Sequence, residues 1–281
     1  MDRPQVPVYA AAAVDALAAG AASMAVSPFI LTIDKAIVQS AAGHTSLLRA
    51  CMTGVTDIIR RPQRALLSNP AYWMVAAVYG VTYFAANLID TACGRMSTGP
   101  ALQGTMKLFG TTAVNTSACI AKDVAFARMF GAQSTGRMPV TTLALFGARD
   151  LLTIGSAFSA PPLLAKALAQ GGVEATRAEN AAQLISPIGM QVFCAPLHLL
   201  ALNMYNMPVA TLGERAAAVA RTAPQTIVAY AVRMAPAFGV GGVMNTALTT
   251  HGRDFLRERY ADNERSTRIG VAVRLQTAAS G

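Results

Sequence analysis

The feature that most constrains this chain is a series of apolar stretches long enough to cross a lipid bilayer. The first, residues 8–31, is rich in alanine and glycine and carries Asp15 as its one charge. A helix needs about 20 mainly apolar residues to span the hydrocarbon core of a membrane. The sequence therefore predicts an all-α membrane protein with six transmembrane helices. The five further stretches lie at about residues 72–90, 105–131, 140–168, 181–206 and 224–249.

Composition and charge narrow the class of protein. Hydrophobic residues make up 53% of the 281 residues and charged residues only 13%, whereas a soluble domain carries about 25% charged residues. The net charge of +9 comes from arginines dispersed among apolar runs. This argues against nucleic-acid binding and favours contact with anionic lipid headgroups or an anionic solute. Four cysteines without CxxC pairing predict buried free thiols and no metal site: Cys51, Cys93, Cys119 and Cys194.

A bent-helix motif recurs along the chain and indicates internal repeats. At Pro28 an apolar helix continues through a proline, which removes a backbone hydrogen bond and kinks the helix. The same pattern returns at Pro196, with a weaker echo at Ser117 between them. The spacings are 89 residues from Pro28 to Ser117 and 79 from Ser117 to Pro196. The alternative is six unrelated spans with accidental prolines. The prediction is one domain over residues 1–262 and a flexible tail over 263–281, with three repeats at about 8–92, 105–169 and 181–249.

Residues 46–60 are predicted to form an amphipathic helix on the membrane surface. Its apolar side chains fall mainly on one side, while Arg49, Asp57, Arg60 and Arg61 supply polar and basic character. A second short polar helix is expected at about 211–221, before the last span.

This layout resembles the mitochondrial carrier family. Its members have three repeats of helix, matrix surface helix and helix, with a proline kink in each odd-numbered helix. Pro28 and Pro196 match that kink, and the resemblance implies a six-helix, carrier-like bundle. The family consensus Pro-x-[Asp/Glu]-x-x-[Lys/Arg] is matched only in part, since Lys122 alone keeps a basic position.

The charged residues next to these motifs are the predicted gate. In mitochondrial carriers the charges of the consensus form a salt-bridge ring that closes the matrix side. Here Asp34, Lys35 and Asp123 lie one to two residues beyond the consensus positions. We expect them to form a displaced polar ring with Lys122.

Three charges lie deep inside predicted spans and form the predicted substrate site. Arg149 and Asp150 resemble the arginine–acid pair of many amino-acid carriers, and Arg233 resembles an arginine that contacts substrate in the sixth carrier helix. An unpaired charge at such a depth costs at least about 2.5 kcal/mol. We expect a central cavity in which the two arginines hold a carboxylate, because the guanidinium fork suits bidentate binding, and Asp150 holds an ammonium group.

Two alternatives remain open for this site. The arginine–aspartate pair would equally serve to tie helices together. Tyr79 is expected to face the same cavity and to hydrogen-bond a solute, but a tyrosine bonded to a backbone carbonyl fits as well. His198 is interpreted as a helix-packing histidine. No catalytic constellation and no cofactor fingerprint are found, so the chain is predicted not to be an enzyme and to need no cofactor.

These features predict a divergent mitochondrial solute carrier, multi-pass in the inner membrane rather than the outer one. It would move a small carboxylate-bearing metabolite, an amino acid or related zwitterion, by alternating access. Its partners would be that solute and membrane lipids, including anionic ones, and no nucleic acid. The alternative is a carrier-fold membrane scaffold or complex subunit that no longer transports and binds a protein partner.

Overall fold

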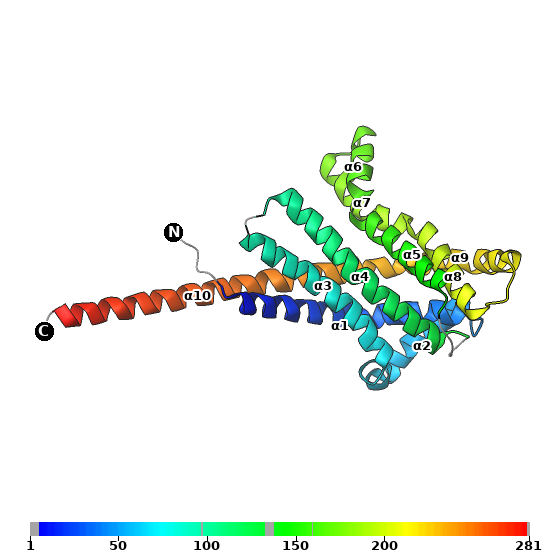
Figure 1. The fold of residues 1–281 in the computed structure, drawn as a ribbon, viewed down its shortest axis with the longest axis horizontal. Helices are drawn as coiled ribbons and strands as arrows, with labels where there is room; N and C mark the ends of the chain where they lie inside the picture. The colour runs from blue at the N-terminus through cyan, green and yellow to red at the C-terminus, as the bar shows by residue number, and fades with distance from the viewer. Residues whose placement is uncertain (1–5, 97, 133–137, 159, 280–281) are drawn as a thin grey trace.

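The computed structural model is a bundle of helices (Figure 1) and describes residues 6–96, 98–132, 138–158 and 160–279. No strand occurs within these ranges. In chain order the elements are α1 (Val8–Ala41), α2 (Leu47–Arg60), η1 (Gln63–Leu67), α3 (Pro70–Arg95), α4 (Pro100–Phe130), α5 (Val140–Phe158), α6 (Ala160–Gln170), α7 (Ala175–Gly189), α8 (Gln191–Asn206), α9 (Leu212–Met234), η2 (Ala235–Gly241) and α10 (Gly242–Ala279), where η1 and η2 are π-helical turns.

Helix α1 runs without interruption through Pro28. Proline has no N–H, so the carbonyl of Met24, four residues earlier, loses its helical partner. The Tyr72 hydroxyl of α3 donates a hydrogen bond to this carbonyl over 3.2 Å. The proline of the predicted bent motif therefore provides a polar contact between two helices inside an apolar bundle.

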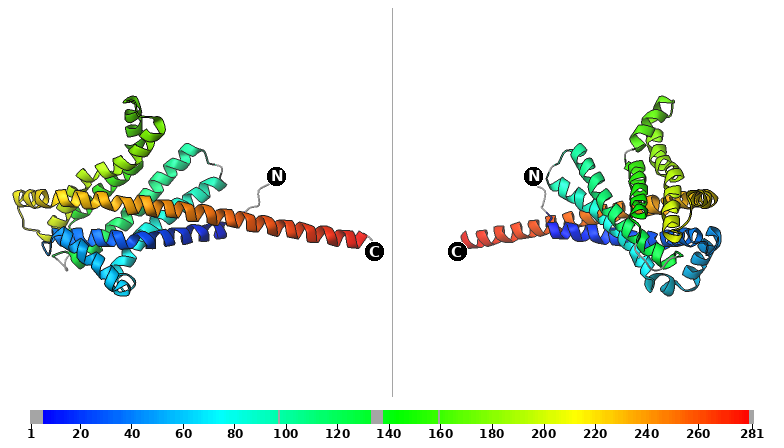
Figure 2. Two further views of the ribbon diagram at one scale, coloured as in Figure 1. Left: turned by 180° about the vertical axis from the view of Figure 1, so that it is seen from behind. Right: turned by 45° about the vertical axis from the view of Figure 1, so that its right-hand side comes forward.

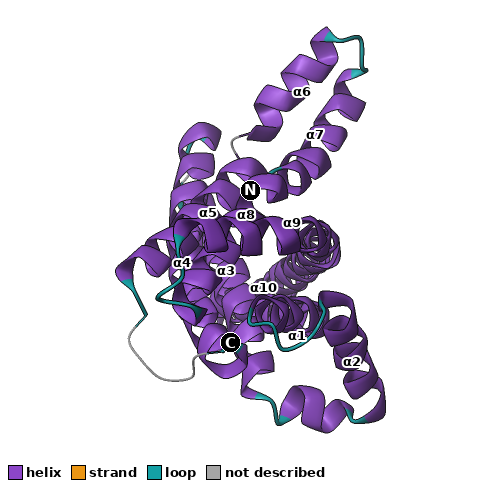
Figure 3. Cartoon of the chain, turned by 90° about the vertical axis from the view of Figure 1, so that its right-hand side faces the viewer, coloured by secondary structure: helices purple, strands orange, loops and turns teal. Residues whose placement is uncertain are grey.

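Helix α2 lies along one flank of α1, apart from α6 and α7 (Figure 3). Gly54 allows the close approach, because a Cβ at this position would lie 2.9 Å from the Thr32 side chain. The helix ends at Arg60, since Pro62 disfavours helical geometry at Arg61, which adopts φ −141° and ψ 58°. The predicted helix over 46–60 is thus confirmed.

The long helices give the molecule its shape. Helix α1 lies beside the α9–η2–α10 rod, and α10 extends beyond the bundle (Figures 1 and 2). Helices α3 and α4 form a hairpin that packs on α1, while α5, α8 and α9 pack together on the other side of the bundle. Helices α6 and α7 form a second hairpin that projects outwards (Figure 3).

A glutamate side chain begins the second arm of this projecting hairpin. Glu174 accepts hydrogen bonds from the backbone N–H groups of Thr176 and Arg177, at 2.9 and 3.1 Å. These N–H groups at the start of α7 have no partner within the helix. Their hydrogen bonds hold the pKa of the Glu174 carboxyl below its ordinary value.

The apolar core lies where α1, α3, α4, α5 and α8 meet. Ile30, Val75, Phe126, Phe146 and Leu202 are each at most 1% exposed. Their burial anchors the middle of the bundle, beside which the charged residues of the site are held.

The number of spans differs from the prediction. Four described helices are long and apolar enough to cross a membrane, or five if α5 and α6, bent by 43°, form one broken span. Residues 105–131 are helical as predicted but do not pass this test, because α4 carries many threonines and polar residues. The predicted six spans were therefore wrong, and the helices give no support for three carrier-like repeats.

The C-terminal third also differs. The short polar helix and the start of the following span form one helix, α9, with Pro224 inside it, and the span continues through η2 into α10. Helix α10 continues to Ala279, where the sequence predicted a flexible tail after residue 262. The tail contains no proline and two glycines, one of them the final residue Gly281, so its composition permits a helix.

Candidate functional site

A cavity of about 200 Å³ lies inside the bundle between α3, α4, α5, α9 and η2. Its wall is mainly apolar, with charged side chains from α4, α5 and α9. Such a mixture of apolar lining and few polar groups is typical of small-molecule sites. The lining residues are Val78, Tyr79, Thr82, Tyr83, Ala86, Thr111, Thr112, Asn115, Cys119, Lys122, Arg149, Asp150, Thr153, Ile154, Arg233, Met234 and Ala237.

The cavity brings together the four residues predicted to contact a solute. Arg149, Asp150, Arg233 and Tyr79 come from three different helices and all line it. The three charged residues are 3%, 2% and 7% exposed, respectively. Charges at such burial need partners.

Asp34 of α1 belongs to an ion-pair network beside the cavity. Its carboxylate accepts a hydrogen bond from the Arg233 guanidinium at 2.9 Å and another from the Lys122 ammonium. These contacts tie α1 to α4 and α9. They join residues up to 199 positions apart in the sequence.

Lys122 connects Asp34 to the other carboxylates of the network. Its ammonium lies 3.0 Å from Asp123, which also accepts a hydrogen bond from Arg149. Arg149 in turn lies 3.1 Å from an Asp150 oxygen. Three cations and three carboxylates thus make a cluster without formal net charge, in which Asp34 and Asp123 each have two cationic partners.

Hydrogen bonding within the cluster is incomplete at the residues that line the cavity. Arg149 Nε, Arg233 Nε and Asp150 Oδ2 are buried and have no hydrogen-bond partner in the described part of the chain. Leaving a buried polar group unsatisfied costs about 1–3 kcal/mol, and more for a charged one. Two donors and one acceptor on cavity-lining residues therefore lack a protein partner.

The lining also includes neutral polar groups. The Thr82 hydroxyl lies 3.2 Å from Asn115 Oδ1, and the Asn115 amide N–H groups have no described protein partner. Tyr83 donates to the Ala237 carbonyl at 2.7 Å, whereas the Tyr79 hydroxyl has no such bond among the described residues. The backbone-bonded alternative raised for Tyr79 thus applies to Tyr83, and Tyr79 keeps its hydroxyl free at the cavity.

Comparison with known families decides the class of protein. A family model described as "Probable citrulline exporter" matches residues 18–252. The chain belongs to this family. No curated protein matches the sequence significantly.

Membership of this family corrects the resemblance to mitochondrial carriers. The match covers most of the chain, whereas the carrier consensus was present only in fragments at Pro28, Lys122 and Pro196. A family of exporters is consistent with a multi-pass transport protein rather than an enzyme. The mitochondrial inner-membrane location rested on the carrier resemblance and loses its support with it.

Only some of the predicted gate residues lie together in the structure. Asp34, Lys122 and Asp123 meet in the ion-pair network. Lys35 points elsewhere, with its ammonium 5.5 Å from the centre of the Phe130 ring, because consecutive helical residues face different sides. Pro28 and Pro196 lie within unbroken helices and line none of the cavity.

His198 packs between two aromatic rings. Its ring centre lies 5.2 Å from Phe146 and 5.7 Å from Tyr230. This placement agrees with the packing role expected from the sequence. No group of three or more His, Cys, Asp or Glu side chains suited to a metal ion occurs within the described ranges.

A second buried polar cluster lies between α1, α3 and α10. Asp15, fully buried, accepts hydrogen bonds from Arg253 Nε and from the Thr91 hydroxyl, at 3.0 and 2.6 Å. Arg253 also donates to the Asn87 carbonyl at 2.9 Å. The Asn87 and Asn245 side-chain amides exchange two hydrogen bonds of 2.9 Å. This cluster lines none of the hollows described here.

Sequence reasoning missed the pairing of several of these residues. The Asp15–Arg253 pair and the Asp34–Arg233 pair join positions 238 and 199 residues apart, which no local motif reveals. A useful signal was present, since Asp15 is an isolated charge in an apolar span and requires a buried partner.

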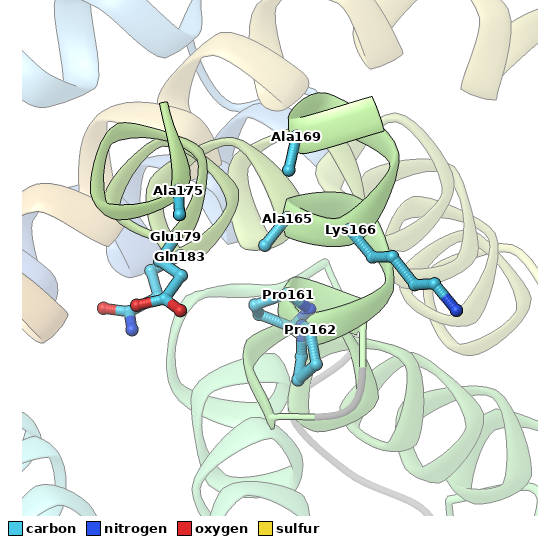
Figure 4. A pocket seen from close by; sticks show the side chains of 8 residues that line it. All are labelled: Pro161, Pro162, Ala165, Lys166, Ala169, Ala175, Glu179 and Gln183. Carbon is cyan, nitrogen blue, oxygen red and sulfur yellow. The ribbon is translucent and has the colours of Figure 1, made fainter. Parts of the chain in front are cut away.

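A larger hollow, about 410 Å³, lies between α6 and α7 (Figure 4). Pro161 and Pro162 approach it from one arm, and Glu179 and Gln183 border it from the other, while Lys166 extends away from it. Lys166 is exposed, and no ion pair of Lys166 or Glu179 is found among the described residues. The buried charges and unsatisfied polar atoms make the smaller cavity the candidate site.

Proposed function

We propose that this protein exports a neutral, zwitterionic amino acid, with citrulline as the solute, through the cavity between α3, α4, α5 and α9. The proposal combines membership of the citrulline-exporter family with the chemistry of the cavity wall. The observation that carries it is the set of unsatisfied atoms on Arg149, Arg233 and Asp150.

These atoms match the two charged groups of an amino acid. In the proposal the α-carboxylate binds the guanidinium groups of Arg149 and Arg233, since charge-assisted hydrogen bonds of this kind are strong. The α-ammonium binds the second oxygen of Asp150. The surrounding cluster has no formal net charge, so it favours a solute that also has none.

The neutral polar groups of the lining suit the rest of the solute. Citrulline ends in a ureido group, which carries a carbonyl acceptor and N–H donors but no charge. Tyr79, Thr82 and Asn115 offer neutral donors and acceptors in the lining of the cavity. Ornithine and arginine would place an additional cation in this region without a carboxylate to meet it, and a buried unpaired charge is strongly disfavoured.

The ion-pair network supplies a closure for alternating access. Asp34 does not line the cavity, but its bonds to Lys122 and Arg233 hold α1, α4 and α9 together beside it. In our proposal a carboxylate competes with Asp34 for Arg233, which loosens this closure when solute binds. Such exchange links binding to opening.

The test is citrulline efflux from liposomes that contain the purified full-length chain. We expect saturable efflux of labelled citrulline, little efflux of ornithine, and a loss of roughly 100-fold in Arg233→Gln. Arg257→Gln is the matched control, because Arg257 pairs with Asp254 on the exposed side of α10. Absence of citrulline flux in folded protein, or normal flux in Arg233→Gln, would refute the proposed site.

A further inference from the structure

A basic groove lies between α1, α2 and η1. This groove holds about 250 Å³ and is distinct from the cavity. Three basic side chains line it, Lys35 from α1 and Arg61 and Arg64 from the α2–η1 junction, together with one acid, Asp57. The remaining lining residues are Leu31, Thr32, Gly54, Ile58, Ala65 and Asn69.

The basic side chains in the groove have no anion of the protein to satisfy them. Neither Arg61 nor Arg64 makes a side-chain hydrogen bond or ion pair within the described residues, and both are exposed. Lys35 contacts the Phe130 ring but likewise no carboxylate. With Asp57 counted, the groove keeps an excess of two positive charges.

Local sequence places the two arginines at this position. Pro62 ends α2, so Arg61 leaves the helix and turns toward α1, and the π-helical turn then brings Arg64 to the same groove. Arg60, the last residue of α2, does not line the groove. Two guanidinium groups that line one groove suit the oxygens of a phosphate group.

The outer face of α2, next to the groove, carries exposed apolar side chains. Leu48, Met52 and Ile59 are 72%, 61% and 75% exposed and recur at helical spacing on one side. An exposed apolar face on a helix with basic residues is typical of a helix lying in the membrane interface. Helix α2 joins two membrane-spanning helices, α1 and α3, so it lies where they leave the bilayer.

We propose that the groove binds the phosphate headgroup of an anionic phospholipid, through Arg61, Arg64 and Lys35, while the lipid chains lie against apolar surface beside α2. The charge excess and the interfacial position of α2 identify this occupant rather than a soluble one. The inference is independent of which solute the cavity carries.

The test titrates the full-length chain in neutral detergent with short-chain phosphatidylglycerol and records the thermal unfolding midpoint. We expect a concentration-dependent rise that phosphatidylcholine of equal chain length does not give. Arg61→Ala with Arg64→Ala should weaken the response roughly 30-fold, from about 1 kcal/mol per basic residue. Lys35→Ala, on a different helix, should weaken it about five-fold.

The matched control is Arg49→Ala with Arg60→Ala, which removes the same charge from α2 outside the groove. It should stay within about three-fold of the wild type, because general attraction to the surface contributes less than a formed site. Equal losses in both double variants would overturn the groove in favour of diffuse charge. An equal response to phosphatidylcholine, or to inorganic phosphate alone, would overturn the anionic lipid as its occupant. Lipid-free unfolding midpoints establish that each variant is folded.

Discussion

Two buried polar clusters in this protein have similar residues but differ in completeness. The Asp15–Arg253 cluster lies between α1, α3 and α10, and the carboxylate oxygens of Asp15 both have partners. The Asp34–Arg233 network lies beside a cavity and leaves donors on Arg149 and Arg233 and an acceptor on Asp150 unsatisfied. Both place charges in an apolar environment, but only the second leaves charged side chains beside a cavity with unpartnered polar atoms.

This difference separates a structural role from a binding role for charges within a membrane. A fully bonded cluster gains nothing from a solute, so its residues should affect folding and leave solute binding unchanged. An incompletely bonded cluster beside a cavity should gain stability when a solute completes it. Variants of each cluster distinguish the two roles.

The largest expected effect belongs to the complete cluster. Asp15→Asn removes the carboxylate that faces Arg253, and loss of one partner of a buried ion pair costs about 3 kcal/mol or more. The Arg253 side chain is 25% exposed, so we expect the lower end of that range. The measurement is the free energy of unfolding in mixed micelles, with Asp254→Asn as the control on the exposed side of α10. A change below 1 kcal/mol would show that the cluster is not structural.

Next in size is the effect of Arg233 on solute affinity. Arg233→Gln should weaken citrulline binding by roughly 10- to 100-fold, since a hydrogen bond to a charged group contributes about 1.5–3 kcal/mol. Stability should change less than in Asp15→Asn, because Asp34 keeps Lys122 as a partner. Binding to the purified protein is measured by calorimetry. A variant that loses stability but keeps its citrulline affinity would make Arg233 structural.

The arrangement of these clusters was only partly predictable from the sequence. The apolar runs identified α1, α3 and the long C-terminal helices, since length and hydropathy determine whether a helix can cross a bilayer. The grouping of Arg149, Asp150, Arg233 and Tyr79 around one cavity was also foreseen, because buried charges must find polar surroundings. Their solute-binding role remains a prediction.

Other features depended on tertiary structure. The apolar residues of α4 suggested that it spans the membrane, but the polar side chains along α4 reduce its mean hydropathy. Lys35 was grouped with Asp34 by proximity in the chain, although the helix turns them to different sides. The partner of Asp15 could not be predicted from the sequence, because Arg253 lies 238 residues away along the chain.

A smaller effect is expected from the amide pair of the complete cluster. Asn87→Ala should lower stability by about 1 kcal/mol, the scale of side-chain hydrogen bonds within membrane bundles. A double-mutant cycle with Asn245→Ala isolates the pair, because the two amides bond to each other. Strictly additive losses would contradict a coupled pair.

The smallest effect concerns the neutral polar groups of the cavity lining. Tyr79→Phe should reduce citrulline affinity roughly three- to ten-fold, since one neutral hydrogen bond contributes about 0.5–1.5 kcal/mol. Tyr83→Phe is the matched control, because the Tyr83 hydroxyl is already bonded to the Ala237 carbonyl. Its affinity should remain that of the wild type. The reverse order of effects would place the solute against Tyr83 instead.

One measurement tests the central claim most directly. The thermal unfolding midpoint of the full-length chain is recorded against citrulline, ornithine and arginine, for the wild type, Arg233→Gln and Asp15→Asn. We predict that citrulline alone stabilises the wild type, by about 2.7 kcal/mol at one hundred times its dissociation constant. The response should disappear in Arg233→Gln and persist in Asp15→Asn from its lower baseline. Equal responses in both variants, or none in the folded wild type, would contradict the assignment of the incomplete cluster as the solute site.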